Sequence, residues 1–445
     1  MALDGATLSS YWALPFLGVL CSIALGPLVL SQVWHHHYGK ISALWTLGVI
    51  VALTVTFGSS ATFHTLAETL LHHYVPFIIF IMSLYVICGG IRLSISAKAT
   101  PFFNTFFLGI TSFIASWVGT TGAAMLFIRP LMDVNQHRSH QSHTIFFFII
   151  LICNIGGCLT AIGDPPLFLG FLSGVPFFWP MEHLLLPFLT LMIPLLGIYY
   201  LLDRHFFRRE EEAFKKISDQ TLQLTVHGFT HIIYLFGAIV AILLSGFMKD
   251  SPHVSFLGID LKVSDLVRDG VLVALTLLSL KTGPQRPRHD NDFSWGPFQE
   301  ICILFAAIFM TAAPVLAMLK AGSDGVFAPL VDLVNTPQGP NNDLYFWLSG
   351  MLSAFLDNAP TYLVFFNLAG GDAVALTTTH AKTLMAISCG AVFMGALTYI
   401  GNAPNFMVKA IAESRGVTLP SFLMYFVYAL LLLLPLFALT DYLWF

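Results

Sequence analysis

Four short polar segments interrupt the apolar parts of this sequence, and each combines oxygen-bearing side chains with glycine or proline. Two of them are LTAIGDPP, which begins at Leu159, and LTYIGNAP, which begins at Leu397. Proline ends a helix that approaches it from upstream, so carbonyl groups near both motifs lose their helical partners. Backbone carbonyls and the side chains of Asp, Asn and Thr are oxygen ligands suited to hard cations such as Na⁺. Both motifs therefore indicate cation binding.

The other two segments have the composition of hairpin tips. Thr120 and Thr121 follow Gly119 in GTTGAAMLF, where small residues let the backbone approach a solute and the following helix offers N–H groups. Asp357 and Asn358 begin DNAPTYLVF and read as a helix cap and start. A carboxylate inside the membrane costs about 2.5–3.5 kcal/mol on insertion scales, which favours a functional role for Asp357. A small-residue helix contact at the first tip and a plain N-cap at the second stay open as alternatives.

We expect the transported ion and solute to contact all four segments. The candidate binding residues are Thr120, Thr121, Asn154, Thr160, Gly163, Asp164, Asp357, Asn358, Thr361, Thr398, Gly401, Asn402 and Asn405. Asp357 and Asp164 are the candidates for proton coupling, because a desolvated carboxylic acid can exchange its proton for a cation. The sequence does not decide between them, and Asp164 also fits an interfacial cap. His137, His140 and His143 lack Cys or carboxylate support, so we expect no bound metal and no cofactor.

Composition places these segments in a membrane. The chain has 445 residues, of which 56% are hydrophobic and only 10% are charged. Soluble proteins average about 25% charged residues. This excludes a secreted disulfide scaffold, a nucleic-acid-binding protein and an ordinary cytosolic enzyme. Neither an HExxH nor a GxSxG motif is present, so a membrane-embedded enzyme is not expected, and a channel is a further alternative.

The apolar runs predict an all-α polytopic membrane protein. About ten runs approach the length of roughly 20 residues that a spanning helix needs. They lie at about 11–34, 41–58, 74–97, 144–163, 183–202, 227–248, 267–281, 298–320, 380–402 and 418–440. Two further runs, 102–127 and 343–370, are broken by Gly, Pro and polar residues, which predicts re-entrant hairpins. The stretch 59–73 is expected to be a surface helix.

The distribution of Lys and Arg sets the direction of these spans. If both termini lie outside, 15 of the 20 basic residues fall in cytoplasmic loops. Cytoplasmic loops of membrane proteins are enriched in Lys and Arg, which supports this orientation. We therefore expect a multi-pass protein of the bacterial inner membrane with periplasmic termini.

An internal repeat relates the two halves of the chain. The two LT–IG motifs begin at Leu159 and Leu397. Gly119 and Asp357, at the two hairpin tips, are separated by the same number of residues. Five predicted crossings separate the hairpins, and an odd number inverts the second copy. Inverted repeats with broken helices are typical of secondary transporters.

The repeat divides the chain into five expected parts. The first half has N-terminal scaffold helices (1–100) and a first transport part (101–202) with hairpin 102–127 and unwound helix 144–163. A cytoplasmic linker (203–226) leads to the second scaffold helices (227–342) and a second transport part (343–445) with hairpin 343–370 and unwound helix 380–402.

The motifs NIGGCLTAIGDPP, DNAPTY and GALTYIGNAPN resemble those of the ion transporter superfamily. That superfamily includes NhaD-type Na⁺/H⁺ antiporters, arsenical pump membrane proteins, CitMHS-type citrate carriers and divalent anion/sodium symporters. The resemblance implies a homodimer in which a transport part slides across the membrane as an elevator. It also implies that Thr120, Thr121, Asp357 and Asn358 line the substrate site, whereas 160–164 and 398–402 line cation sites.

The hairpin tips depart from the dicarboxylate symporters of that superfamily, which carry Ser-Asn-Thr at both tips. Here the tips read Gly-Thr-Thr and Asp-Asn-Ala, and an acidic tip would repel a di- or tricarboxylate. We therefore predict a proton-coupled sodium antiporter, with a sodium- or proton-coupled citrate or dicarboxylate transporter as the alternative. The expected partners are the lipid bilayer, a second copy of the chain and a small ion or molecule, with no nucleic acid.

The topology makes a testable prediction. Single cysteines introduced by Lys215→Cys and Lys382→Cys should react with an impermeant maleimide from opposite sides of the membrane, because an odd number of predicted crossings separates them. Labelling of both positions from the same side would contradict the predicted topology.

Overall fold

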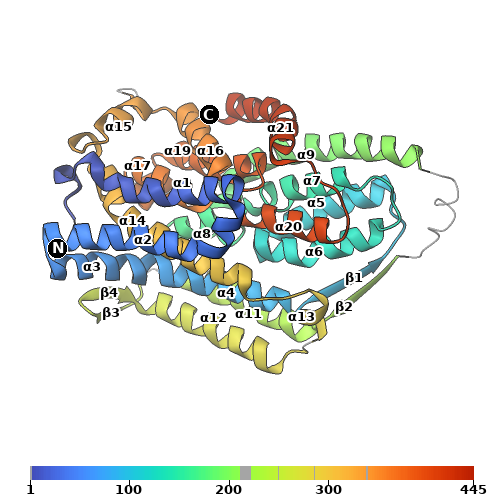
Figure 1. Ribbon diagram of the computed structural model, residues 1–445, viewed down its shortest axis with the longest axis horizontal. Coiled ribbons are helices and arrows are strands. Elements are labelled where there is room, and N and C mark those ends of the chain that lie inside the picture. Colours follow the sequence, from blue (N-terminus) through green and yellow to red (C-terminus); the bar gives the residue numbers. More distant parts are fainter. Residues whose placement is uncertain (1–2, 211–221, 249, 285, 337–338) are drawn as a thin grey trace.

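Helices make up most of the protein in the computed structural model, which describes residues 3–210, 222–248, 250–284, 286–336 and 339–445 (Figure 1). The helices are α1 (Leu14–Val29), α2 (Ser31–Phe57), α3 (Ser59–Thr69), α4 (Val75–Gly89), α5 (Pro101–Val118), α6 (Thr120–Asn135), α7 (Ser142–Leu151), α8 (Pro165–Leu172), α9 (Trp179–Arg208), α11 (Phe229–Phe247), α12 (Val263–Thr282), α13 (Arg286–Asp290), α14 (Gly296–Lys320), α15 (Ala328–Val334), α16 (Asn342–Phe355), α17 (Asn358–Leu368), α18 (Ala373–Thr377), α19 (Ala381–Phe393), α20 (Ala403–Ser414) and α21 (Phe422–Trp444). Three two-stranded antiparallel ribbons join them: β1 (Arg92–Ser96) with β2 (Gln223–His227), β3 (His253–Phe256) with β4 (Ile259–Lys262), and β5 (Asn335–Thr336) with β6 (Gly339–Pro340).

In the described residues, eight helical segments are long and apolar enough to cross a membrane, which confirms the prediction of an all-α polytopic membrane protein. Seven of them coincide with predicted spans, and the eighth, Pro101–Val118, is the first arm of a predicted hairpin.

The three other predicted spans correspond to shorter or more polar helices. The predicted spans 144–163 and 380–402 contain only shorter apolar helical segments, Ser142–Gly157 and Ala381–Leu397, because both are interrupted at their breaks. The predicted span 267–281 lies within α12, which carries charged side chains at both ends and is not one of the eight segments.

The N-terminal region differs from the sequence-based prediction in two places. Residues 59–73 do not form a separate surface helix, because α3 continues through a π-helical turn at Leu70–Tyr74 into α4, giving one run of 31 residues from Ser59 to Gly89. The predicted span 74–97 is also too long. After Gly89 the chain enters β1, which pairs with β2 from Arg92 opposite His227 to Ser96 opposite Gln223.

The same pairing revises the linker predicted at 203–226. Helix α9 continues into its start as far as Arg208, and β2 occupies its end. Residues 211–221 between them, which include Lys215, lie outside the described residues. The linker therefore begins and ends in regular structure, and β2 ties its end to the segment that follows α4.

Each predicted hairpin consists of two helices that pack against each other and break at the predicted tip. Helices α5 and α6 are separated by Gly119, whose φ of 78° lies in the region that favours glycine. Helices α16 and α17 are separated by Leu356 and Asp357, and the Asp357 carboxylate caps α17 by accepting from Ala359 N–H at 3.1 Å. The cap predicted at the second tip is thus present.

Local contacts recur at the offset that relates the two halves of the sequence. The Thr160 hydroxyl donates to the Ser116 carbonyl, and the Thr398 hydroxyl donates to the Ala354 carbonyl at 2.5 Å. Both acceptors lie near the end of the first arm of a hairpin, so each unwound segment is tied to its own hairpin in the same way. This repetition supports the predicted duplication of the chain.

The N-caps of the helices that follow the breaks repeat as well. Asp164 precedes α8 with φ −145° and ψ 147°, and Asn402 precedes α20 with φ −151° and ψ 138°. The equivalent backbone angles place the Asp and Asn side chains in corresponding positions of the two copies.

The outer helices carry the exposed large apolar side chains expected of a lipid-facing surface. Examples are Val55 on α2, Ile193 on α9, Phe236 on α11 and Leu431 on α21. Figure 1 shows α9 and α21 along one edge of the molecule and α11 and α12 along the opposite edge. The hairpins and broken helices lie between these edges, where the polar side chains of the candidate site are buried.

The close crossing at the first break predicts a stability effect. A Cβ at Gly163 would lie 2.1 Å from the Gly157 carbonyl oxygen and 3.0 Å from Ser116 Cα. Gly163→Ala is therefore expected to cost about 1–3 kcal/mol through overpacking, seen as a lower Tm of the detergent-purified protein. Gly48→Ala on α2 is the control, because a Cβ there meets no atom within 4 Å. Equal Tm values for the two variants would contradict the close packing.

Candidate functional site

One carboxylate joins all four breaks. Asp164 is fully buried, and its Oδ1 accepts hydrogen bonds from Thr120 Oγ1 at 2.7 Å and from Asn402 Nδ2 at 3.0 Å. Its Oδ2 accepts a hydrogen bond from Asn358 Nδ2. The donors come from the first hairpin tip, the second unwound segment and the second hairpin tip. Side chains from both copies of the repeat therefore converge on Asp164.

Asparagine side chains satisfy the backbone carbonyls that the breaks release. Asn402 Nδ2 also donates to the Cys153 carbonyl at 2.8 Å. Asn405 Nδ2 donates to the carbonyls of Gly395 at 3.0 Å and Thr398 at 2.9 Å. In the membrane interior, where water is absent, each backbone carbonyl left without a donor would cost several kcal/mol. The amides thus explain how irregular backbone is tolerated at this depth.

The two copies are also joined directly through their amides. Asn154 Nδ2 donates to Asn405 Oδ1 at 2.8 Å and to the Ile149 carbonyl at 2.8 Å. Asn154 Oδ1 and Asn358 Oδ1 are both buried and have no hydrogen-bond partner among the described residues. Both unsatisfied atoms are acceptors, so the group that would satisfy them is a donor or a cation.

Two carbonyls of the first unwound segment accept hydrogen bonds from the protein. The Gly163 carbonyl accepts from Thr120 N–H at 2.8 Å, and the Thr160 carbonyl accepts from Gly163 N–H at 3.1 Å. In the second segment Gly401 N–H donates to Thr398 Oγ1 at 3.0 Å. The side-chain oxygens that lack donors belong instead to asparagines.

Three further candidates, Thr361, Asp357 and Thr121, contact other parts of the site. Thr361 Oγ1 donates to the Asp357 carbonyl within its own helix at 3.1 Å. Asp357 and Thr121 line a cavity of about 680 Å³, which Asn402 also lines. Asp164 itself does not line this cavity, so Asn402 connects the buried carboxylate to the cavity wall.

Residues from many parts of the chain line the cavity. They come from α1, α2, α4, α6, α14 and the loop that precedes α14, the second hairpin tip, the second unwound segment and α20. Arg129 of α6 lines it together with Thr121 and Met125, which precede it by eight and four residues. These spacings put all three side chains on one face of α6. The sequence analysis missed Arg129, and this spacing from the tip was the available signal.

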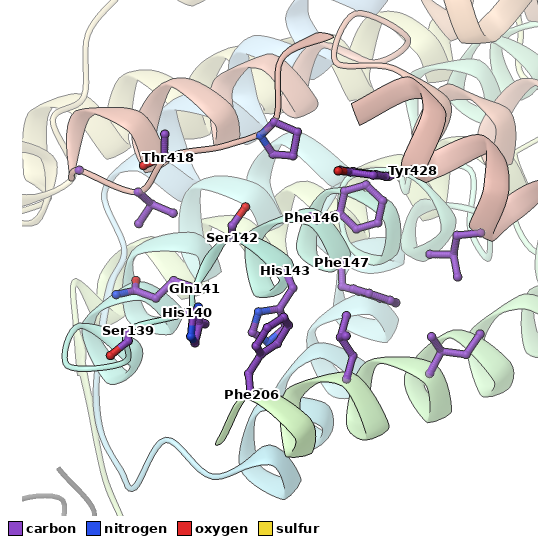
Figure 2. Close-up of a pocket in the computed structure, with 16 residues that line it drawn as sticks. Ser139, His140, Gln141, Ser142, His143, Phe146, Phe147, Phe206, Thr418 and Tyr428 are labelled. Carbon is purple, nitrogen blue, oxygen red and sulfur yellow. The ribbon is translucent and has the colours of Figure 1, made fainter. Parts of the chain in front are cut away.

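A second cavity, of about 660 Å³, contains none of the candidate residues. It is lined by the loop 139–143 and by aromatic side chains, and Figure 2 shows His143 next to Phe206. His143 Nε2 lies 3.0 Å from Asp203 Oδ1, which also accepts from Arg138 at 2.7 Å. Burial lowers the pKa of Arg138, but the carboxylates of Asp203 and Glu210 outweigh burial and hold that pKa above its usual range.

In the described part of the chain, no group of three or more His, Cys, Asp or Glu side chains is placed to hold a metal ion.

Comparison with known families identifies the chain more closely. Residues 5–445 match the family described as "Putative citrate transport". The chain belongs to this family. The match confirms the resemblance to the ion transporter superfamily and places the chain in its citrate-carrier branch. No curated protein matches the chain.

Membership of the citrate transport family, together with the apolar helices, establishes a multi-pass membrane transporter. The candidate site of this family member is thus the Asp164 junction together with the adjoining cavity.

The Asp164 junction predicts a difference between two neighbouring threonines. Thr120→Val removes one donor to a buried carboxylate and keeps the volume of the side chain, so it should destabilise the protein by about 1–3 kcal/mol. Thr121→Val is the control, because Thr121 lines the cavity without a hydrogen bond to Asp164. Denaturation of the purified protein measures both effects. A Thr121→Val variant as unstable as Thr120→Val would contradict this assignment.

Proposed function

We propose that the chain is a cation-coupled secondary transporter of a small organic anion of the citrate class, with Asp164 as the coupling carboxylate. The observation that carries the coupling is the convergence of Thr120, Asn358 and Asn402 on this one buried acid. An ionised carboxylate can be held in a buried site only when charge-assisted hydrogen bonds or a cation compensate it.

The side chains that donate to Asp164 can also coordinate a cation next to it. An Asn amide donates through Nδ2 and accepts through Oδ1, and a Thr hydroxyl does both. Rotation of Asn358 or Asn402 exchanges a donor to the carboxylate for an oxygen ligand to Na⁺. The unpartnered Oδ1 atoms of Asn154 and Asn358 are available for that role. We therefore assign the coupling ion, Na⁺ or H⁺, to the vicinity of Asp164.

The organic anion is supported by the family and by the size of the cavity. A cavity of about 680 Å³ is much larger than a bare Na⁺ requires and falls in the range of small-molecule sites. Its wall includes residues of both the predicted scaffold helices and the predicted transport parts, which supports alternating access by movement of one part against the other. Inverted repeats, an elevator motion, a homodimer and a bacterial inner membrane with periplasmic termini belong to the same proposal.

Sodium/proton antiport, the first prediction from the sequence, is the second candidate. It is favoured by Asp357, because this carboxylate faces the cavity and accepts a hydrogen bond from the N–H of Ala359 rather than from a cationic side chain. A cavity-facing acid attracts a cation and repels a free tricarboxylate.

Transport into proteoliposomes tests the main proposal. Uptake of labelled citrate should follow an imposed Na⁺ or H⁺ gradient, and Asp164→Asn should abolish the gradient-driven component because the coupling charge is lost. Asp372→Asn is the matched control, since Asp372 is an exposed N-cap on α18. Uptake by Asp164→Asn that responds to the gradient like the parent protein would overturn the coupling role.

Everted vesicles with a pH-sensitive dye test the second candidate. Under antiport, added Na⁺ should dissipate a preformed proton gradient, and Asp357→Asn should suppress this response. A normal response in Asp357→Asn would remove this acid from the mechanism, and no response in the parent protein would remove sodium/proton antiport.

A further inference from the structure

We infer that Arg129 binds a carboxylate of the transported anion and thereby determines the substrate class. This inference rests on the proposed function, because it names the side chain that recognises the cargo in the same cavity. Arg129 is only 5% exposed, yet its Nε and Nη1 have no hydrogen-bond partner among the described residues. Its Nη2 lies 3.6 Å from Asp292 Oδ2.

Asp292 does not neutralise Arg129 effectively. The Asp292 side chain is 84% exposed, and ion pairs with such exposed groups contribute little. A buried guanidinium with two free donor nitrogens carries an uncompensated desolvation cost. A carboxylate that accepts two parallel N–H bonds would use Nη2 together with Nε or Nη1, so it would displace the exposed Asp292. Nε and Nη1 are themselves buried, so a carboxylate in the cavity that Arg129 lines would reach them only after the guanidinium turns.

Other buried arginines are engaged by the protein. Arg138 donates to Asp203, Glu210 and the Ala99 carbonyl. Arg288 also leaves Nε and Nη1 without partners among the described residues, but its Nη2 donates to Ser279 and it does not line the cavity. Among these three side chains, Arg129 alone combines burial, unpartnered donors and a place on the cavity wall.

The position of Arg129 along α6 sets the geometry of binding. Eight residues separate it from Thr121, which corresponds to about 12 Å at roughly 1.5 Å per residue. Met125 lies between them on the same face and offers apolar contact to a carbon skeleton. A carboxylate at Arg129 is therefore kept away from the end of the cavity that Thr121 lines.

Charge then sets the order of binding. Asp357 repels an incoming anion until a cation near the tips offsets its charge, and Asp292 and Glu300, which line the same cavity, add to the repulsion. Arg129 attracts the anion but cannot by itself balance two or three carboxylates. The cation should bind first, and the apparent affinity for the anion should rise with the Na⁺ or H⁺ concentration.

Uptake kinetics of labelled citrate in proteoliposomes test the inference. Arg129→Gln should raise KM at least about tenfold at a saturating concentration of the coupling cation, and Arg129→Lys should recover part of the loss. Asp292→Asn should leave KM unchanged or lower it, because it frees Nη2. Arg204→Gln is the control, since Arg204 is exposed on α9 and does not line the cavity.

The outcomes separate anion binding from a structural ion pair. If Arg129→Gln and Asp292→Asn cause the same defect, or if Arg129→Gln keeps the parent KM, the inference is overturned.

A failure of the proposed function is distinguishable from these outcomes. If the parent protein takes up no citrate, thermal stabilisation of the detergent-purified protein by citrate, succinate and acetate is measured instead. Stabilisation of the parent protein that Arg129→Gln loses supports an anion site at Arg129. Stabilisation of neither protein, or of both equally, overturns the inference.

Discussion

The structure depends on the compensation of one buried carboxylate. Asp164 is surrounded by donors from a hairpin tip of its own half and from two segments of the other half. These segments are non-helical for short stretches, and their free backbone groups must also be satisfied. The asparagines perform both tasks, because one Nδ2 group of Asn402 reaches the Asp164 carboxylate and the Cys153 carbonyl. The polarity of the site and the breaks in the helices are therefore parts of one network.

Within this network, the two copies of the predicted repeat differ in charge. Asp164 and Asn402 occupy equivalent positions in the two copies, and they contact each other at 3.0 Å. Two ionised carboxylates at this separation would repel each other, so a symmetric Asp–Asp pair would require a proton or cation to be bound at all times. An Asp–Asn pair is compatible with the site both with and without a bound proton or cation. The contact between the copies thus explains why their shapes agree and their charges differ.

Much of the fold and site follows from local sequence. The two LT–IG motifs, the hairpin tips and the constant offset between the two halves anticipated where the helices break and which side chains stand there. Local patterns did not anticipate the ribbon at Arg92–Ser96, because its partner strand is Gln223–His227, far along the chain, and the pairing is a tertiary interaction. Local patterns also did not show that Asp164 and Asp357 occupy different parts of the site. Only the folded chain distinguishes the acid at the junction from the acid on the cavity wall.

Arg129 shows a second limit of sequence reasoning and bears on how cation and anion are coupled. In the sequence it was counted only among the basic residues that orient the spans, because its spacing from the first hairpin tip indicates a shared helix face but does not show whether the guanidinium is buried or snorkels. In the folded chain it shares a cavity wall with Asp357, so that cavity presents both signs of charge. In the proposed mechanism, a free cation meets Arg129 and a free anion meets Asp357, and each ion reduces the repulsion felt by the other. Coupling between the two ions can therefore arise from electrostatics within one cavity.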